Sequence, residues 1–490
     1  MTKRGTASLT AARIVRISIL CAVAVVVFCA TALARQRRQA HRAHRATPTP
    51  TAMPSALKPV VLITGGTGIV DRPTGQTPGV LSTAEIYDPV RRQFLPIASM
   101  KERRDQFAAA AIGIDRVLIV GGINTLLVPL NIFPGPAMPW VLRSAEIFSA
   151  GDGKFVAAPS MKYSRDGPTA TALDNGKVLI VGGESNVAEL YDPASNAFSE
   201  TGSMASSRHG QTATPLRDGS VLIAGGGFLK LEVYDPAKGK FNFAGKLNDN
   251  RLYHTATLLG DGRVLIAGGC PFARSSAVDT SEIFDESHRT VRPGPKMTES
   301  RAGHTATLLG DGRVLIAGGH GDNSSEFYDP ASRKFVAGPK MIEARSGHSA
   351  TLLPDGTVLL AGGWNPDYKP LSDAEIFDPT TNKFAAAGEM AEARAEHSAT
   401  LIWARAPINW ILPTPSATPT ATPTSTPTAT PTLTPTTTQT STPTETSSST
   451  EKATPAEKSS PSGTTTPSGT STQTETLTPT RTPSPTGTPR

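Results

Sequence analysis

Cysteine is almost absent from this chain of 490 residues. Of its three cysteines, Cys21 and Cys29 lie in one apolar run near the N-terminus, which leaves Cys270 alone in the rest of the chain. A single cysteine cannot form an intradomain disulfide. The stability of any folded part must therefore come from the packing of a hydrophobic core.

Acidic residues are missing altogether from residues 1–57, which hold nine lysines and arginines. The formal net charge of the whole chain is +7, so the remainder sums to −2 (7 − 9). The excess of basic over acidic residues thus lies in residues 1–57. It gives no support to nucleic-acid binding, which needs positive charge on the folded surface. A membrane surface is the expected partner of these basic residues.

Long apolar runs are also scarce, and the main one covers residues 17–34 without a single charge. Its 18 residues are near the lower limit for a membrane-spanning helix. The sequence Ala32-Leu33-Ala34 is typical of a signal-peptide cleavage site, whereas the arginines after it are typical of a retained anchor. We therefore expect residues 1–34 to form an apolar helix, either a signal peptide or a membrane anchor. The bulk of the chain is then tethered or secreted, outside the cytoplasm.

Helical periodicity is absent between residues 58 and 404, where the sequence instead repeats. Each unit has a glycine pair and a glutamate that precedes an apolar and an aromatic residue. The distance from each of the first six glutamates to the next glycine pair is constant, whereas the step from glycine pair to glutamate varies widely. A fixed frame with one variable loop indicates a repeat architecture. The markers are Gly65-Gly66, Gly121-Gly122, Gly182-Gly183, Gly225-Gly226, Gly268-Gly269, Gly318-Gly319 and Gly362-Gly363, with Glu85, Glu146, Glu189, Glu232, Glu282, Glu326 and Glu375.

Four short β-type runs recur in each unit. In one unit they are residues 304–309, 314–317, 326–330 and 334–337, and a Gly-Asp-Gly turn follows the first. The second run is apolar throughout, which is typical of a strand covered on both faces.

The two ends of the repeat region complement each other. The first unit begins at Val60 and lacks its first strand, whereas a surplus first strand, residues 397–402, follows the seventh unit. Pairing these strands would complete seven units and leave no exposed edge. The sequence therefore predicts an all-β fold, a seven-bladed β-propeller over residues 58–404 whose C-terminal strand closes blade one.

The units resemble Kelch repeats in the glycine doublet, the Glu-x-aromatic-Asp-Pro strand and the methionine before the next unit. The resemblance covers residues 58–404 and implies a Kelch-type propeller. One departure is that phenylalanine replaces the family's tryptophan in the fourth strand, at Phe94, Phe155, Phe198, Phe241, Phe335 and Phe384.

An arginine follows every glutamate at one fixed spacing, and strand parity places both on the face that carries the variable loops. The arginines form either a cationic ring for an anionic ligand or structural pairs with the glutamates. Because they occur one to one in all seven units, and binding sites are usually asymmetric, we favour the structural interpretation. The arginines are Arg104, Arg165, Arg208, Arg251, Arg301, Arg345 and Arg394.

No pattern in the repeat region predicts catalysis or a cofactor. Histidines stand at the third position after the arginine in four successive units, but no cysteine or additional carboxylate completes a metal-ligand set. Tyr253-His254 with Cys270 is similar to the ligand pair and Cys–Tyr cross-link of galactose oxidase, a copper enzyme on this fold. However, His254 belongs to the repeat, and the appended domain that supplies a further ligand is not found. Catalytic residues, metal ligands and cofactors are therefore not predicted.

The variable loops supply the binding candidates. The loop Ile123–Arg143 is strongly apolar and uncharged until its end, so it is either a plug over the channel or a lip that binds a partner. The loop that begins at Trp364 suits an aromatic platform for a sugar. The candidate residues are Phe133, Trp140, Arg143, Trp364 and Tyr368.

Residues 35–57 form a basic and then Pro/Thr-rich linker, and residues 405–490 form a tail of mostly Thr, Pro and Ser. Such a tail cannot bury a core, so we expect a disordered surface stalk. The sequence as a whole favours an extracytoplasmic, non-catalytic binding module that presents one propeller face to a protein or glycan. The alternative is a carbohydrate-active enzyme on the same fold, such as a sugar oxidase or mutarotase.

Overall fold

The structure is a computed structural model that describes residues 57–72, 75–124, 140–271, 276–319 and 321–405. The expected anchor and Phe133 lie outside these ranges, as do the expected linker and tail except for Leu57 and Arg405, which are the end residues of two strands. Within them, no helix is long and apolar enough to cross a membrane.

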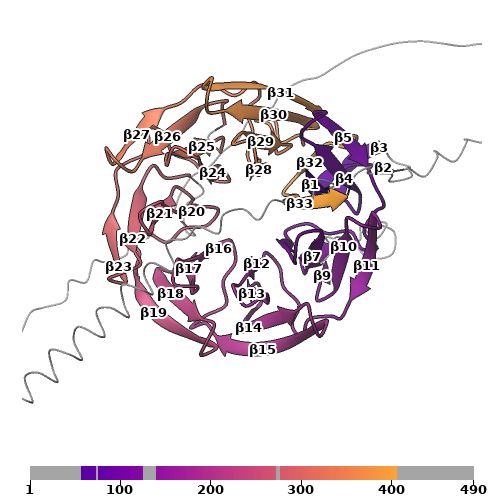
Figure 1. Cartoon of the computed structure of the whole chain (residues 1–490). Coiled ribbons are helices and arrows are strands. Elements are labelled where there is room, and N and C mark those ends of the chain that lie inside the picture. The colour runs from indigo at the N-terminus through magenta and orange to yellow at the C-terminus, as the bar shows by residue number, and fades with distance from the viewer. Residues whose placement is uncertain (1–56, 73–74, 125–139, 272–275, 320, 406–490) are drawn as a thin grey trace, which may run out of the picture. The chain divides into compact units, whose positions relative to one another are not determined.

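All regular elements of the described residues are β-strands, and seven antiparallel sheets have four strands each. Figure 1 shows these sheets arranged in a ring. The first sheet contains both ends of the repeat region, because β33 (Ser398–Arg405) pairs with β1 (Leu57–Thr64) over all eight residues of each strand. β1 continues to β4 (Ala84–Asp88) and β5 (Gln93–Pro96).

The other six sheets each use four strands that follow one another along the chain. The second to fourth sheets consist of β6 (Ala108–Ala111), β7 (Arg116–Val120), β10 (Ala145–Ser149) and β11 (Lys154–Ala158); β12 (Thr169–Ala172), β13 (Val178–Gly182), β14 (Ser185–Asp192) and β15 (Ala197–Ser203); and β16 (Gln211–Pro215), β17 (Val221–Gly225), β18 (Lys230–Asp235) and β19 (Lys240–Lys246).

The fifth to seventh sheets repeat this order. They consist of β20 (Thr255–Leu258), β21 (Arg263–Ala267), β22 (Ser281–Asp285) and β23 (Thr290–Pro293); β24 (Thr305–Leu308), β25 (Val314–Ala317), β26 (Ser325–Asp329) and β27 (Lys334–Ala337); and β28 (Ser349–Leu352), β29 (Val358–Ala361), β30 (Asp373–Asp378) and β31 (Lys383–Glu389).

The inner strands close the ring. β33, β6, β12, β16, β20, β24 and β28 each contact the next one around, and β28 contacts β33 again (Figure 1). Apolar side chains fill the spaces between neighbouring sheets in seven buried clusters. One of these clusters packs Val61 and Tyr87 of the first sheet against Leu359 and Ile376 of the seventh, so the last interface is built like the others.

The phenylalanines of the fourth strands pack against an aromatic residue of the third strand. The ring centroids lie 4.8–5.1 Å apart in six sheets. In the first sheet, for example, Phe94 contacts Tyr87. Two medium-sized aromatic rings thus occupy the space between blades, and phenylalanine suffices at this position.

One feature of the loops was not expected from the sequence. The variable segment after Gly66 folds into a hairpin, β2 (Thr67–Arg72) and β3 (Gly75–Val80), which pairs with β32 (Arg394–Ala395). A short ribbon of β8 (Ile123–Asn124) and β9 (Trp140–Val141) frames the apolar loop. These additions lie at the starts of inner strands and shape the face described next.

Candidate binding site on the loop-bearing face

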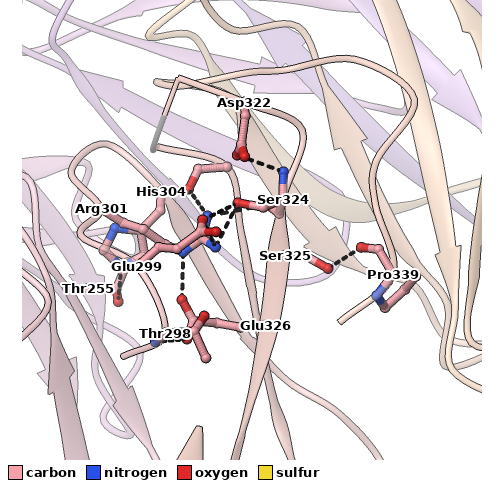
Figure 2. A network of polar contacts seen from close by, with 11 residues as sticks. Thr255, Thr298, Glu299, Arg301, His304, Asp322, Ser324, Ser325, Glu326 and Pro339 are labelled. Atoms are coloured by element: carbon pink, nitrogen blue, oxygen red, sulfur yellow. Dashed lines mark hydrogen bonds and ion pairs between the residues drawn. The ribbon is translucent and has the colours of Figure 1, made fainter. Parts of the chain in front are cut away.

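The repeat arginines and glutamates are joined in buried ion pairs. The seven arginines are at most 2% exposed, and a guanidinium nitrogen of each lies 2.6–3.2 Å from a carboxylate oxygen of the sheet that it enters. Figure 2 shows this contact for Arg301 and Glu326. The pairs are Arg104–Glu146, Arg165–Glu189, Arg208–Glu232, Arg251–Glu282, Arg301–Glu326, Arg345–Glu375 and Arg394–Glu85. Because each charge has a partner, these rings belong to the frame of the fold.

The glycine pairs join the frame to the next sheet. The first glycine's carbonyl accepts a hydrogen bond from the arginine, at 2.6–3.0 Å in all seven cases. The second glycine's N–H donates to the next arginine's carbonyl, as from Gly226 to Arg251. At Gly225, φ is +66° and a Cβ would lie 2.6 Å from the Arg251 carbonyl oxygen. No side chain fits in this position.

The four repeat histidines also connect neighbouring sheets. Nε2 of each lies 2.8–3.0 Å from a Thr or Ser hydroxyl of the preceding sheet, as for His304 and Thr255. Burial, with the nearby arginine adding to it, lowers the pKa of His254, His304 and His397 to about 3. These rings are therefore neutral at pH 7. Among the described residues, no group of three or more His, Cys, Asp or Glu side chains is placed to hold a metal ion.

An asymmetric feature lies at the second position after each arginine. Here all seven units adopt left-handed backbone, with φ from +50° to +66°. Backbone hydrogen bonds link these residues from sheet to sheet, including Gly303 N–H to the Tyr253 carbonyl and Glu396 N–H to the Gly347 carbonyl. We call this ring of residues the rim. Its members are Gln106, Gly167, Gly210, Tyr253, Gly303, Gly347 and Glu396.

Glycine occupies four positions of the rim, as its backbone conformation favours. Gln106, Tyr253 and Glu396 occupy the other three, although a residue with a Cβ costs roughly 1–2 kcal/mol in this conformation. Backbone strain of this kind gathers at functional sites. The three side chains are therefore the first candidates for a role beyond the frame.

A buried carboxyl group lies directly beside the rim. Asp105 is 7% exposed, and its two oxygens accept hydrogen bonds from the Thr67 hydroxyl and the Gln106 N–H. Burial raises the pKa of Asp105 to about 6. The hydrogen bond from Thr67 opposes this shift, and the negative charges of Glu396 and Asp166 add to it. Because the ring closes, Glu396 lies near enough to Asp105 for its charge to act on this carboxyl group.

The next two units carry Asp166 and His209 at the position of Asp105. His209 Nδ1 lies 3.3 Å from the Asp166 carbonyl oxygen and 3.9 Å from its Oδ2. Burial raises the pKa of Asp166, His209 opposes this shift, and Glu184 adds to it. Oδ1 of Asp166 is buried without a hydrogen-bond partner.

Two aromatic residues complete this polar group. Tyr253 is 48% exposed, and its pKa is raised by burial and then by the charges of Glu396, Cys270, Asp166 and Asp105. The same carboxylates thus act on Tyr253 and on Asp105. Trp364 Nε1 donates to Glu396 Oε1 at 3.4 Å. We define the rim site as Asp105, Asp166, His209, Tyr253, Trp364 and Glu396.

The structure separates the loop candidates of the sequence analysis. Trp364 lies in the rim site, whereas Tyr368 is 83% exposed and Trp140 is 68% exposed on β9. Arg143 is exposed at the end of the loop that contains Trp140. Sequence reasoning did not assign the other five residues of the rim site. For Tyr253 and Glu396 the available signal was a side chain at a position that is glycine in four units. For Asp105, Asp166 and His209 it was a charged or titratable residue directly after the repeat arginine, where other units have Leu, Ala or Ser.

A closed ring of four-stranded antiparallel sheets is a β-propeller. Residues 344–391 match the Kelch motif model, which confirms the resemblance inferred from the repeats. The chain therefore contains a Kelch motif within its ring of repeated sheets.

Solved structures provide further matches. A fungal alcohol oxidase of the AA5 family, in complex with copper, is 17% identical with a TM-score of 0.51, over 63% of this chain and 68% of that one. YjhT is 14% identical with a TM-score of 0.44, over 58% of this chain and 97% of that one. No curated protein matches the chain in sequence. Because its identity to this chain is so low, the likeness to the oxidase shows the fold alone.

Proposed function

We propose that the chain is a seven-bladed Kelch propeller, closed by its C-terminal strand, that binds a partner through the rim site without catalysing a reaction. The asymmetry of the rim carries this proposal. Its conformation favours glycine, and four units have glycine there. The remaining units place Gln106, Tyr253 and Glu396 at the same position, beside a buried carboxyl group. Left-handed non-glycine residues also occur in the turns before the fourth strands, so the strain supports a ligand through its combination with the polar groups that meet at the rim.

The partner that we propose is a protein or glycan outside the cytoplasm. The apolar segment at residues 17–34 supports this location, because it suits a signal peptide or a membrane anchor. The variable loops support a protein or glycan partner. They differ in length and lie on one face, and a rigid scaffold commonly presents binding groups in this way.

Capture experiments with the full-length chain test the proposal. Glycan arrays and pull-downs should give hits that Tyr253→Gly and Glu396→Gly abolish, while the melting temperature stays the same or rises because strain is relieved. Asp152→Asn is the matched control, since this exposed residue lies in a turn on the opposite face. Hits that persist in both rim variants would place the partner elsewhere.

A second candidate, the enzyme, is favoured by one observation. A carboxyl group with a pKa of about 6, as in Asp105, can accept and donate protons near neutral pH. The test is to incubate the full-length chain with aldoses, with and without added copper, and to follow optical rotation and peroxide. Turnover that Asp105→Asn abolishes would favour the enzyme over the binding module.

A further inference from the structure

The charges that act within the rim site are mostly negative. Asp105 is influenced by Glu396 and Asp166, and Tyr253 by these three carboxylates and by Cys270. His209 is the one basic group among the rim-site residues, and it lies against Asp166. The repeat arginines do not neutralise this group, because each is paired with a buried glutamate of the frame. A ligand for this surface gains by bringing positive charge.

Two acceptor oxygens beside the rim lack a hydrogen-bond donor. One is Oδ1 of Asp166. The other is Oε1 of Gln211, which takes the position of the repeat histidines and whose Nε2 donates to the carbonyls of Gly167 and Val181, so this oxygen belongs to the frame. Both oxygens are buried, so each leaves a hydrogen bond unmade. An ammonium group has three donors and no acceptor, which suits a carboxylate such as Asp166 that has an acceptor oxygen without a donor.

The aromatic residues favour an organic cation over a simple metal ion. Tyr253 is half-exposed among the carboxylates, and Trp364 contacts Glu396. The faces of such rings attract ammonium groups. The described residues include no metal-binding group of three or more His, Cys, Asp or Glu, so the carboxylates are too dispersed to coordinate one metal ion together. An ammonium group does not need such a ligand set, because a carboxylate and an aromatic face are enough to bind it.

We propose that the rim site recognises an organic ammonium group, with Glu396 and Asp166 as the charge partners and Tyr253 as the aromatic contact. This inference rests on the proposed function, because it names the ligand class of the same site. Lysine side chains and amino sugars both carry the required group.

Calorimetric titration of the full-length chain with pentylammonium and with 1-pentanol provides the first test. The two probes have the same chain length and differ in charge. Pentylammonium should bind, and 1-pentanol should bind about tenfold more weakly or not at all. Equal binding of the two probes, or no binding of pentylammonium, would overturn the inference.

Two variants test whether pentylammonium binds at the rim site. Glu396→Gln keeps the size of the side chain and should weaken pentylammonium binding about tenfold. Tyr253→Gly relieves backbone strain and should weaken it about fivefold. The control, Asp152→Asn, removes one negative charge from the opposite face and should change nothing. If Glu396→Gln and Tyr253→Gly bind pentylammonium as well as the unaltered chain, the cation binds elsewhere and the inference fails.

Competition with larger molecules distinguishes the source of the ammonium group. A lysine-rich peptide is compared with its acetylated form, and chitosan oligomers with fully acetylated chitin oligomers. Displacement of pentylammonium by the unacetylated member of either pair supports the inference and identifies the source. Displacement by acetylated and unacetylated members alike contradicts it. If pentylammonium does not bind but the rim variants still abolish array or pull-down hits, the ligand class is wrong and the proposed function stands.

Discussion

Single residues of the rim site are less favourable for folding than their counterparts in other units. Where Asp105 is buried, other units carry Leu252, Ala302 and Ala395, which have no charge to bury. Where Glu396 holds left-handed backbone, other units have glycine. Both differences should lower the free energy of unfolding, so both should be measurable without knowledge of the ligand.

Asp105→Asn should raise the free energy of unfolding by about 1–3 kcal/mol at pH 8 and change it little at pH 4. The folded-state pKa is about 6 and the ordinary value is 3.8, so the folded state holds the proton more strongly. The resulting stability is lost as pH rises from 3.8 through 6. Asparagine cannot ionise; its Oδ1 can accept from the Gln106 N–H while its Nδ2 donates to the Thr67 hydroxyl. Urea unfolding at both pH values measures the effect, and an equal change at pH 4 and pH 8 would contradict the assignment.

At the scale of elements, the strands that repeat were predictable and the unique ones were not. Residues 314–317 and 334–337 coincide with β25 and β27, because the same apolar and aromatic runs recur in every unit. Among the described residues, the hairpin of β2 and β3 occurs in one unit, and its glycines and prolines are typical of a loop. Its pairing with β32 joins segments from the first and last parts of the repeat region, which no local pattern encodes.

The buried ion pair between Arg104 and Glu146 gives a prediction with a neighbouring control. Arg104→Ala should lower the free energy of unfolding by about 3–5 kcal/mol, because it leaves Glu146 buried without its charge partner. Arg103→Ala changes the adjacent, exposed arginine and should shift stability by less than about 0.5 kcal/mol. Chemical denaturation of the two variants measures the difference. Equal effects would mean that the buried pair does not stabilise the frame.

At the scale of the whole molecule, the rim site depends on closure of the ring. Asp105 and Asp166 belong to successive units, and their position after a repeat arginine could be noted from the chain alone. Glu396 joins them only because the last inner strand, β33, lies between β28 and β6. The sequence could therefore suggest the position of each residue within its unit. Which residues meet across the rim follows from the order of the sheets around the ring.

Closure can be tested with a single buried side chain. Ile402 on β33 is 1% exposed and packs in the cluster between the first and second sheets. Ile402→Ala should lower the free energy of unfolding by about 2–5 kcal/mol. Arg405→Ala, at the exposed end of the same strand, is the control and should have little effect. A chain that ends at His397 should lose cooperative unfolding that a chain ending at Arg405 retains, and similar melting of these two chains would contradict the role of β33.

The pairing of β1 with β33 also places the two ends of the described repeat region beside each other. Leu57 and Arg405 are register partners at one end of this pair, and Thr64 and Ser398 are partners at the other, next to the rim. Leu57 and Arg405 therefore lie side by side, roughly 25 Å along the strands from the rim. A chemical label at Leu57 or at Arg405 would therefore sit a full strand length from the rim site and leave its side chains unaltered.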